Sequence, residues 1–243
     1  MFVFADYHTH TTYSHGKGSI EDNVKVAIEK GLREIAISDH GPGHMGFGIK
    51  RKKYKEMRNV IDQLNVKYNN INILLGLEAN VLDIEGNIDI DEEMMEYNDI
   101  LLVGYHFGSK PTKLYRDLLM HFHNYRSSKS DYSYKKVKEI NTISLVNAIN
   151  KYSIDLITHP GAKGPIDLFE VSTNAKNNNT ALEINSSHGH LTVDEIKLSM
   201  NVKGLEYIIS SDAHIPTDVG NFSKAIERAE LSSLDISRIR NAE

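Results

Sequence analysis

Residues 1–40 read MFVFADYHTHTTYSHGKGSIEDNVKVAIEKGLREIAISDH and contain an apolar strand pattern, a helical pattern and a second strand pattern. We predict the two strands at 2–8 and 34–40. Between them, Ser19 is followed three residues later by Asp22, which is the signature of a capping box at the start of a helix. Apolar strands that alternate with helices are typical of a parallel sheet covered by helices.

The same alternation continues along the chain and predicts seven strands in all. The further apolar runs cover residues 72–78, 99–106, 155–160, 181–187 and 207–214. Thr192 followed by Glu195 marks another helix start. An open doubly wound sheet usually has a Gly-rich phosphate turn after its first strand, and the first strand here has none, so the sequence favours a closed α/β barrel.

Composition and charge limit the classes of function. The 243 residues include no Cys, which excludes disulfides, thiolate zinc sites, iron–sulfur clusters and cysteine nucleophiles. The 28 basic and 33 acidic side chains give a formal net charge of −5 and are spread along the chain, so nucleic acid is an unlikely partner and a small substrate is expected. Since neither a signal-peptide pattern nor an apolar run of about 18 residues is present, we expect a cytoplasmic protein that is not bound to a membrane.

The domain organisation is predicted to be simple. No Pro- or Ser-rich linker, change of composition or fixed repeat divides the chain, so we expect a single domain over residues 1–243. The stretch at about 107–133 is rich in Lys, Ser and Tyr and is expected to be an elaborated loop before a helix near 135–151.

Six of the seven predicted strands finish with His, Asp or Glu at or just past the carboxyl end. In a parallel barrel these ends lie on one face, where such enzymes keep their catalytic residues. A lone His at a strand end is usually an ordinary core or rim residue, but packing gives no reason for the same choice on six strands. With His15 from the loop after the first strand, the candidate metal ligands are His8, His10, His15, His40, Glu78, His106, His159, Asp212 and His214.

The chemistry of these side chains indicates the kind of metal. Imidazole and carboxylate without sulfur suit Zn, Mn or Fe, whereas Mg prefers oxygen ligands. At three or four protein ligands per catalytic ion, the nine candidates support roughly two to three divalent transition ions.

Seven short motifs resemble those of one family. HTHTTYSHG, SDHG, GLEAN, GYH, THPG, LEINSS and SDAH occur in that order between Asp6 and about Asn221. They resemble the PHP family, the phosphoesterases named after polymerase and histidinol phosphatase, and within it the stand-alone bacterial phosphatases. The resemblance implies a distorted (β/α)7 TIM-like barrel and a metal-dependent phosphoesterase that hydrolyses small phosphomonoesters.

The resemblance also implies how the ligands are shared. One ion would be held by His8, His10, Glu78 and Asp212, a second by Glu78, His106 and His159, and a third by His15, His40 and His214. Glu78 would bridge the first two ions, a metal-bound hydroxide would attack phosphorus, and the third ion would stabilise the leaving oxygen. The candidate catalytic residues are therefore Asp39, Glu78 and His214.

Other polar residues have two interpretations each. Asp39 could orient a His or carry a proton, or it could simply cap a turn, and His44 in the Gly-rich loop could contact a substrate phosphate or be solvated. Possible phosphate-steering cations that could equally be solvated are Lys17, Arg51 and Lys163. Four His residues are not required by the resemblance, namely His121 and His123, expected on the surface, and His188 and His190, while Glu183 is not counted among the ligands.

Three alternative functions remain open from the sequence. The first is a histidinol phosphatase proper. The second is an amidohydrolase-like metal hydrolase, although such enzymes commonly use a Lys carbamate where Glu78 stands here. The third is a non-catalytic structural PHP module, which the complete set of ligands argues against.

Overall fold

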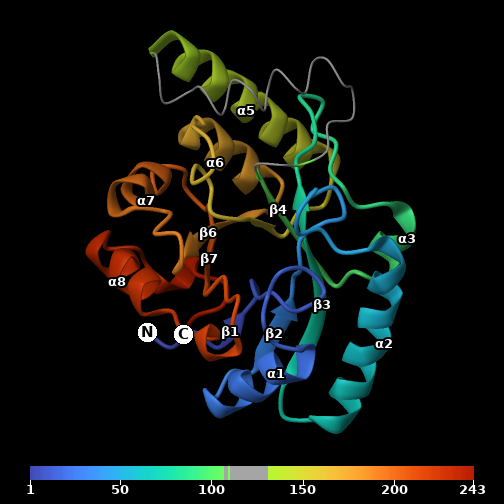
Figure 1. Ribbon diagram of the computed structural model, residues 1–243. Helices are drawn as coiled ribbons and strands as arrows, with labels where there is room; N and C mark the ends of the chain where they lie inside the picture. Colours follow the sequence, from blue (N-terminus) through green and yellow to red (C-terminus); the bar gives the residue numbers. More distant parts are fainter. Residues whose placement is uncertain (107–108, 110–130) are drawn as a thin grey trace.

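Seven parallel strands form a nearly closed barrel in a computed structural model that describes residues 1–106, 109 and 131–243 (Figure 1). The strands are neighbours in sequence order: β1 (Ala5–Asp6), β2 (Glu34–Ile37), β3 (Asn72–Asn80), β4 (Ile100–Gly104), β5 (Leu156–Ile157), β6 (Ala181–Asn185) and β7 (Tyr207–Ser210). The predicted fold class and all seven strands are confirmed. Every strand except β3 ends earlier than predicted, so most candidate ligands lie in the loops just beyond the strands.

Helices surround the strands on the outside (Figure 1). They are α1 (Ile20–Glu29), α2 (Arg51–Lys67), α3 (Glu92–Tyr97), α5 (Asp131–Lys151), α6 (Leu168–Asn177), α7 (Val193–Ser199) and α8 (Ser223–Leu231), with 3-10 turns η2 (Pro216–Asp218) and η3 (Ile236–Arg238). Both predicted capping boxes are present, with Ser19 and Thr192 as the N-cap residues. Within the described ranges, none of the helices has the length and apolar character that crossing a membrane requires.

The predicted loop at about 107–133 lies almost entirely outside the described residues. Only Ser109 and the first turn of α5 are described there, and the predicted surface residues His121 and His123 are not. The helix expected near 135–151 is present as α5, which begins a few residues earlier, at Asp131.

Strand alternation decides what fills the barrel. Successive side chains on a strand point to opposite faces, so one set faces the helices and the other faces the barrel interior. The interior set forms a small apolar cluster of Ala36, Ile100, Leu102, Leu156, Ala181 and Ile208, with Tyr7 and Leu74 packed against it. Glu78 and Glu183 have the same parity as Leu74 and Ala181, so both carboxylates point inward beyond this apolar plug, toward the carboxyl ends of the strands.

The gap between β1 and β7 is closed differently at its two ends. At the carboxyl end, Thr9 and Ala213 form a parallel bridge, in which His10 N–H donates to Ala213 O (2.8 Å). At the amino end, the buried side chain of Asn241 spans the gap: its Nδ2 donates to Ala5 O (2.8 Å) and Ile209 O (2.7 Å), and its Oδ1 accepts from Ile209 N–H (3.0 Å). Asn241 therefore replaces missing backbone pairing between the first and last strands.

Replacing Asn241 with Ala is expected to lower the free energy of unfolding by about 2–3 kcal/mol, because buried backbone groups of both strands lose their partners. Urea denaturation of the metal-free protein measures this. Asn70→Ala is the matched control, since Asn70 is exposed and a change within about 0.5 kcal/mol is expected there. Equal stability of the two variants would contradict the closing role of Asn241.

Candidate metal centre

The predicted ligands gather around one cavity at the carboxyl ends of the strands. The space between these side chains measures about 650 Å³, part of which is open to solvent. His8 and His10 are almost fully buried beside it. The residues that line it are His15, His40, His44, Phe47, Glu78, His106, His159, Lys163, Ser187, His188, Asp212 and His214.

Glu78 lies at the middle of the group. Its Oε1 is 3.0 Å from His159 Nε2, 3.1 Å from His106 Nε2 and 3.3 Å from His8 Nε2, and its Oε2 is 2.7 Å from His40 Nδ1. Burial alone would raise the pKa of Glu78, but the surrounding imidazoles, His106 foremost, hold that pKa well below its usual value. The carboxylate is therefore charged and contacts imidazoles that follow four different strands.

Several buried nitrogen and oxygen atoms crowd together at the centre, and some of them have no hydrogen-bond partner among the described residues. His40 Nδ1 and Glu78 Oε2 are buried and only 2.7 Å apart, yet neither has a hydrogen-bond partner among the described residues. In addition, His106 Nε2 and His159 Nε2 lie 3.2 Å apart and within about 3 Å of the same Glu78 oxygen. Buried lone pairs that converge without partners are costly unless a cation lies among them, so the donor set fits a metal centre.

Among the described residues, four groups of side chains have ligand atoms within 4.8 Å of one another. Together they contain all nine predicted ligands; three of the groups share residues, and the fourth, which includes His188, shares none with the others. The groups are His10/His15/His40/His214, His8/His10/Glu78, His40/Glu78/His106 and His159/His188/Asp212.

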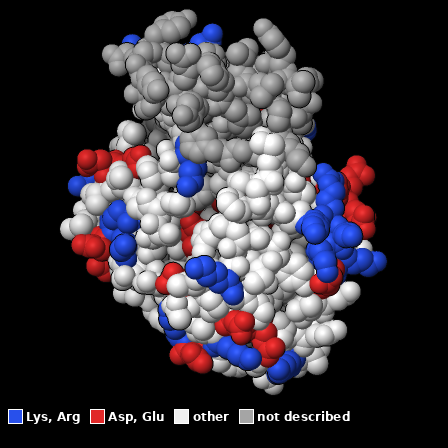
Figure 2. Space-filling view, viewed as in Figure 1, with Lys and Arg blue, Asp and Glu red and all other residues white. Residues whose placement is uncertain are grey.

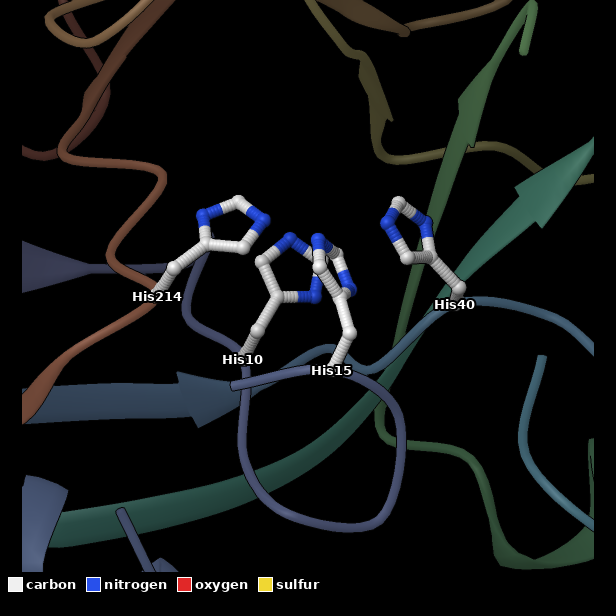
Figure 3. Close-up of side chains that lie close together, drawn as sticks. All are labelled: His10, His15, His40 and His214. Atoms are coloured by element: carbon white, nitrogen blue, oxygen red, sulfur yellow. The ribbon is translucent and has the colours of Figure 1, made fainter. Parts of the chain in front are cut away.

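One group, called the outer group below, consists of four imidazoles, of which those of His15 and His214 are partly exposed (Figure 3). His10 and His15 come from the loop after β1, His40 follows β2 and His214 follows β7. The ring centroids of His15 and His214 are 4.3 Å apart, and those of His15 and His40 are 4.8 Å apart. The distorted barrel thus brings residues of its first, second and last strands together at one point.

Hydrogen bonds fix the orientation of two ligand rings, those of His8 and His214. His8 Nδ1–H donates to Glu183 Oε1 (2.7 Å), which directs Nε2 toward Glu78 Oε1 (3.3 Å). His214 Nδ1–H donates to Asp212 O (2.9 Å), which leaves its Nε2 free. A histidine whose second nitrogen donates to a carboxylate or carbonyl is the usual arrangement of a metal ligand.

Glu183 was set aside as a ligand by sequence reasoning, and the structure gives it a different task. Its Oε2 accepts from the backbone N–H of His159 (2.5 Å) and from Asn185 Nδ2 (3.0 Å), while Oε1 holds His8. Asn185 Nδ2 also donates to Asp212 Oδ2 (3.1 Å). One buried carboxylate therefore positions three of the predicted ligands, directly or through Asn185.

The ionisation of the imidazoles differs across the centre. Burial lowers the pKa of His106 and of His15 to about 4, so both are neutral at neutral pH. Burial would also lower the pKa of His8 and His159, but the carboxylates around them, Glu78 above all, outweigh burial and raise both values.

Metal loading near pH 7 is consequently expected to release about one to two protons per chain, since His8 and His159 must lose theirs to bind a cation. Calorimetric titration of the metal-free protein with Mn²⁺ in two buffers of different ionisation enthalpy measures the number. The release should fall as the pH rises above the raised pKa values. Loading without proton release would contradict the charged state of these two rings.

Sequence and structure comparisons agree on one family. A family model described as PHP domain matches residues 6–188. The chain belongs to the PHP family. A probable phosphatase of Shewanella frigidimarina is 30% identical over 99% of this chain and 90% of that protein, and one of Caldanaerobacter subterraneus is 31% identical over 93% and 82%.

The PHP fold is also seen in a solved structure. Histidinol phosphate phosphatase from Lactococcus lactis, complexed with Zn, L-histidinol and phosphate, superposes with a TM-score of 0.62 at 17% identity, covering 95% of this chain and 93% of that one. The predicted family and phosphatase class are confirmed: this PHP protein is a metal-dependent phosphatase and therefore a hydrolase. The amidohydrolase and non-catalytic alternatives are set aside.

Only some of the remaining predicted residues of this PHP protein line the cavity. Asp39 is buried and does not line the cavity; its carboxylate accepts from Thr11 N–H (2.8 Å), Thr11 Oγ1 (2.5 Å) and Ser14 Oγ, which fixes the loop that carries His15. Of the three possible steering cations only Lys163 lines the cavity, whereas Arg51 pairs with Asp91 and Lys17 is not in the lining.

His188 lines the cavity, although the resemblance to the PHP family does not require it. Its Nε2 lies 3.2 Å from Asp212 Oδ2, and its ring centroid is 5.2 Å from that of His159. Its position just past β6 at the same end of the barrel as the other ligands was the available signal. His190 lies 3.4 Å from Glu195 and does not line the cavity.

Proposed function

We propose that this PHP protein hydrolyses small phosphomonoesters with two to three divalent transition ions, Zn, Mn or Fe, held at the described centre. The observation that carries the proposal is the convergence of nine His, Glu and Asp side chains on one cavity, with Glu78 in contact with imidazoles from four strand ends. Ions bound there would polarise the phosphoryl oxygens and activate water as a nucleophile.

The side chains at the centre have separate proposed roles. Glu78 would help to hold two ions with its charged carboxylate, and His15, His40 and His214, joined by His10, would hold a third. We propose that Asp39 acts as a positioning residue, because its oxygens are occupied by Thr11 and Ser14. His214 would offer its Nε2 to the third ion, the one proposed to stabilise the leaving oxygen.

The shape and charge of the site favour small substrates. The apolar plug fills the barrel below Glu78, so among the described residues the site opens toward the carboxyl ends of the strands. On the face in Figure 2, Lys and Arg alternate with Asp and Glu around the described surface and form no continuous basic band there. A long nucleic acid needs such a band, whereas a single phosphate needs only the metals and a nearby cation such as Lys163.

The test is a direct comparison of substrates on protein stripped of metal and reloaded with Mn²⁺ or Zn²⁺. The panel contains p-nitrophenyl phosphate, phosphorylated metabolites including histidinol phosphate, and single-stranded DNA. We expect hydrolysis of monoesters that requires added metal and exceeds DNA hydrolysis. Nuclease activity above monoesterase activity, or monoester hydrolysis equal in stripped and loaded protein, would overturn the proposal.

A further inference from the structure

His44 lines the cavity but belongs to none of the ligand groups among the described residues. It lies in the loop of residues 41–48, which connects the end of β2 to α2 and contains four glycines. Its ring stacks on that of His40, with centroids 5.3 Å apart and an angle of 23° between the planes. The ring is therefore beside the metal centre without being part of it.

The loop's own backbone determines which nitrogen of His44 carries the proton. Nδ1 accepts hydrogen bonds from Phe47 N–H (3.1 Å) and Gly46 N–H (3.3 Å). A nitrogen that accepts two N–H groups must have its lone pair free, so the proton of the neutral ring is on Nε2. Because Nδ1 faces the loop, Nε2–H on the other side of the ring is the group available to the cavity.

Hydrogen bonds and close packing hold the loop in place and so fix the direction of the Nε2–H group of His44. Gly43 N–H donates to the buried carboxylate of Asp89 (2.7 Å), and Gly48 N–H donates to the carbonyl of His44 itself (3.0 Å). A Cβ at Gly43 would lie 2.7 Å from an Asp89 oxygen, and one at Gly48 would lie 2.5 Å from the carbonyl oxygen of Gly41, so both close approaches require glycine. A donor fixed in advance loses little entropy when it binds.

We propose that His44 Nε2–H donates a hydrogen bond to a phosphoryl oxygen of the substrate, which makes His44 a substrate-binding residue and not a metal ligand. The inference rests on the proposed phosphomonoesterase function. A ligand nitrogen needs a lone pair directed at the ion, and His44 has used its lone pair on the loop. The group that it offers the cavity is a donor, and a bound phosphate provides acceptors there.

Two substitutions separate the two nitrogens of His44. In His44→Asn the amide Oδ1 takes the place of Nδ1 and can keep the loop bonds, while the Nε2–H donor is lost. In His44→Gln the amide nitrogen reaches the place of Nε2–H, while the loop acceptor is lost. Met45→Ala is the control in the same loop, because Met45 is exposed and does not line the cavity.

The experiment measures binding of inorganic phosphate to the Mn²⁺-loaded protein by calorimetry, metal content by elemental analysis, and KM and kcat for p-nitrophenyl phosphate. For His44→Asn we expect full metal content and phosphate binding weakened roughly 10- to 100-fold, with a parallel fall in kcat/KM, because one hydrogen bond to a charged group is lost. His44→Gln and Met45→Ala should retain phosphate affinity within a few-fold.

The tautomer of His44 can be determined by a measurement that does not involve activity. Long-range ¹H–¹⁵N spectra of the metal-free protein, assigned by comparison with His44→Asn, should show His44 protonated on Nε2. Unchanged phosphate affinity in His44→Asn, loss of metal in that variant, or a proton on Nδ1 would each overturn the inference. Phosphate binding needs no turnover, so wild-type protein that binds phosphate but hydrolyses no monoester would refute the proposed function and leave this test intact.

Discussion

Glu78→Gln is expected to lower turnover by roughly 10²- to 10⁴-fold, because removing one partner of a buried charged group costs about 3–5 kcal/mol. Gln keeps the size and one carbonyl oxygen but loses the negative charge. Since Glu78 contacts His8, His40, His106 and His159, its neutralisation should loosen the two ions that it is proposed to bridge.

His15→Ala is the matched comparison for this prediction. Of the four ligand groups, His15 belongs to the outer one alone and is partly exposed, so its loss should weaken one ion and leave measurable turnover. Rates should be taken at saturating Mn²⁺ with bound metal counted, so that metal loss and a defect in turnover are distinguished. Near-normal turnover of Glu78→Gln with full metal content would show that the bridging role is wrong.

Glu183→Gln is expected to weaken metal affinity by roughly 10- to 100-fold although Glu183 is not a predicted ligand. The amide cannot accept from His8 Nδ1–H, from the His159 backbone and from Asn185 all at once, so the ligand rings lose their fixed orientation. Competition with a chelator of known affinity measures the effect.

Glu206→Gln controls for the loss of a carboxylate elsewhere in the barrel. Glu206 pairs with Arg240 at the amino side of β7, away from the cavity, and its substitution should leave metal affinity unchanged. If Glu183→Gln bound metal as tightly as Glu206→Gln, the positioning role of Glu183 would have to be abandoned.

The fold could be predicted from local sequence because each strand and helix carries its own signal. Apolar runs, helical periodicity and the capping boxes at Ser19 and Thr192 are properties of neighbouring residues, and the barrel follows from their alternation. The sequence predicts strand ends that lie too far along the chain, because the apolar runs lead directly into residues such as His40 and Asp212. In the structure these two residues lie beyond the strand ends, at the site. Asp212 and His159 even have positive φ angles of 56° and 28°, which ends strand geometry.

The ligands could be predicted as a set but not as separate groups. Position at a strand end shows that side chains share a face, whereas the sharing of His10 and His40 between groups depends on distances across the barrel. Glu183 is correctly left out of the ligand set, but its positioning role could not be predicted, because its partners lie after β1, after β5 and on its own strand. Asp39 accepts hydrogen bonds from Thr11 and Ser14. Both residues lie in a loop, and no periodic sequence pattern predicts the path of a loop.

The most direct test of the central claim is the metal content of the protein, measured by elemental analysis after reconstitution at neutral pH and removal of free ions. Nine converging ligands predict two to three transition ions per chain. The same measurement on Glu78→Gln should give at least one ion fewer. A reproducible content below one ion per chain in the unaltered protein would contradict a multinuclear metal centre.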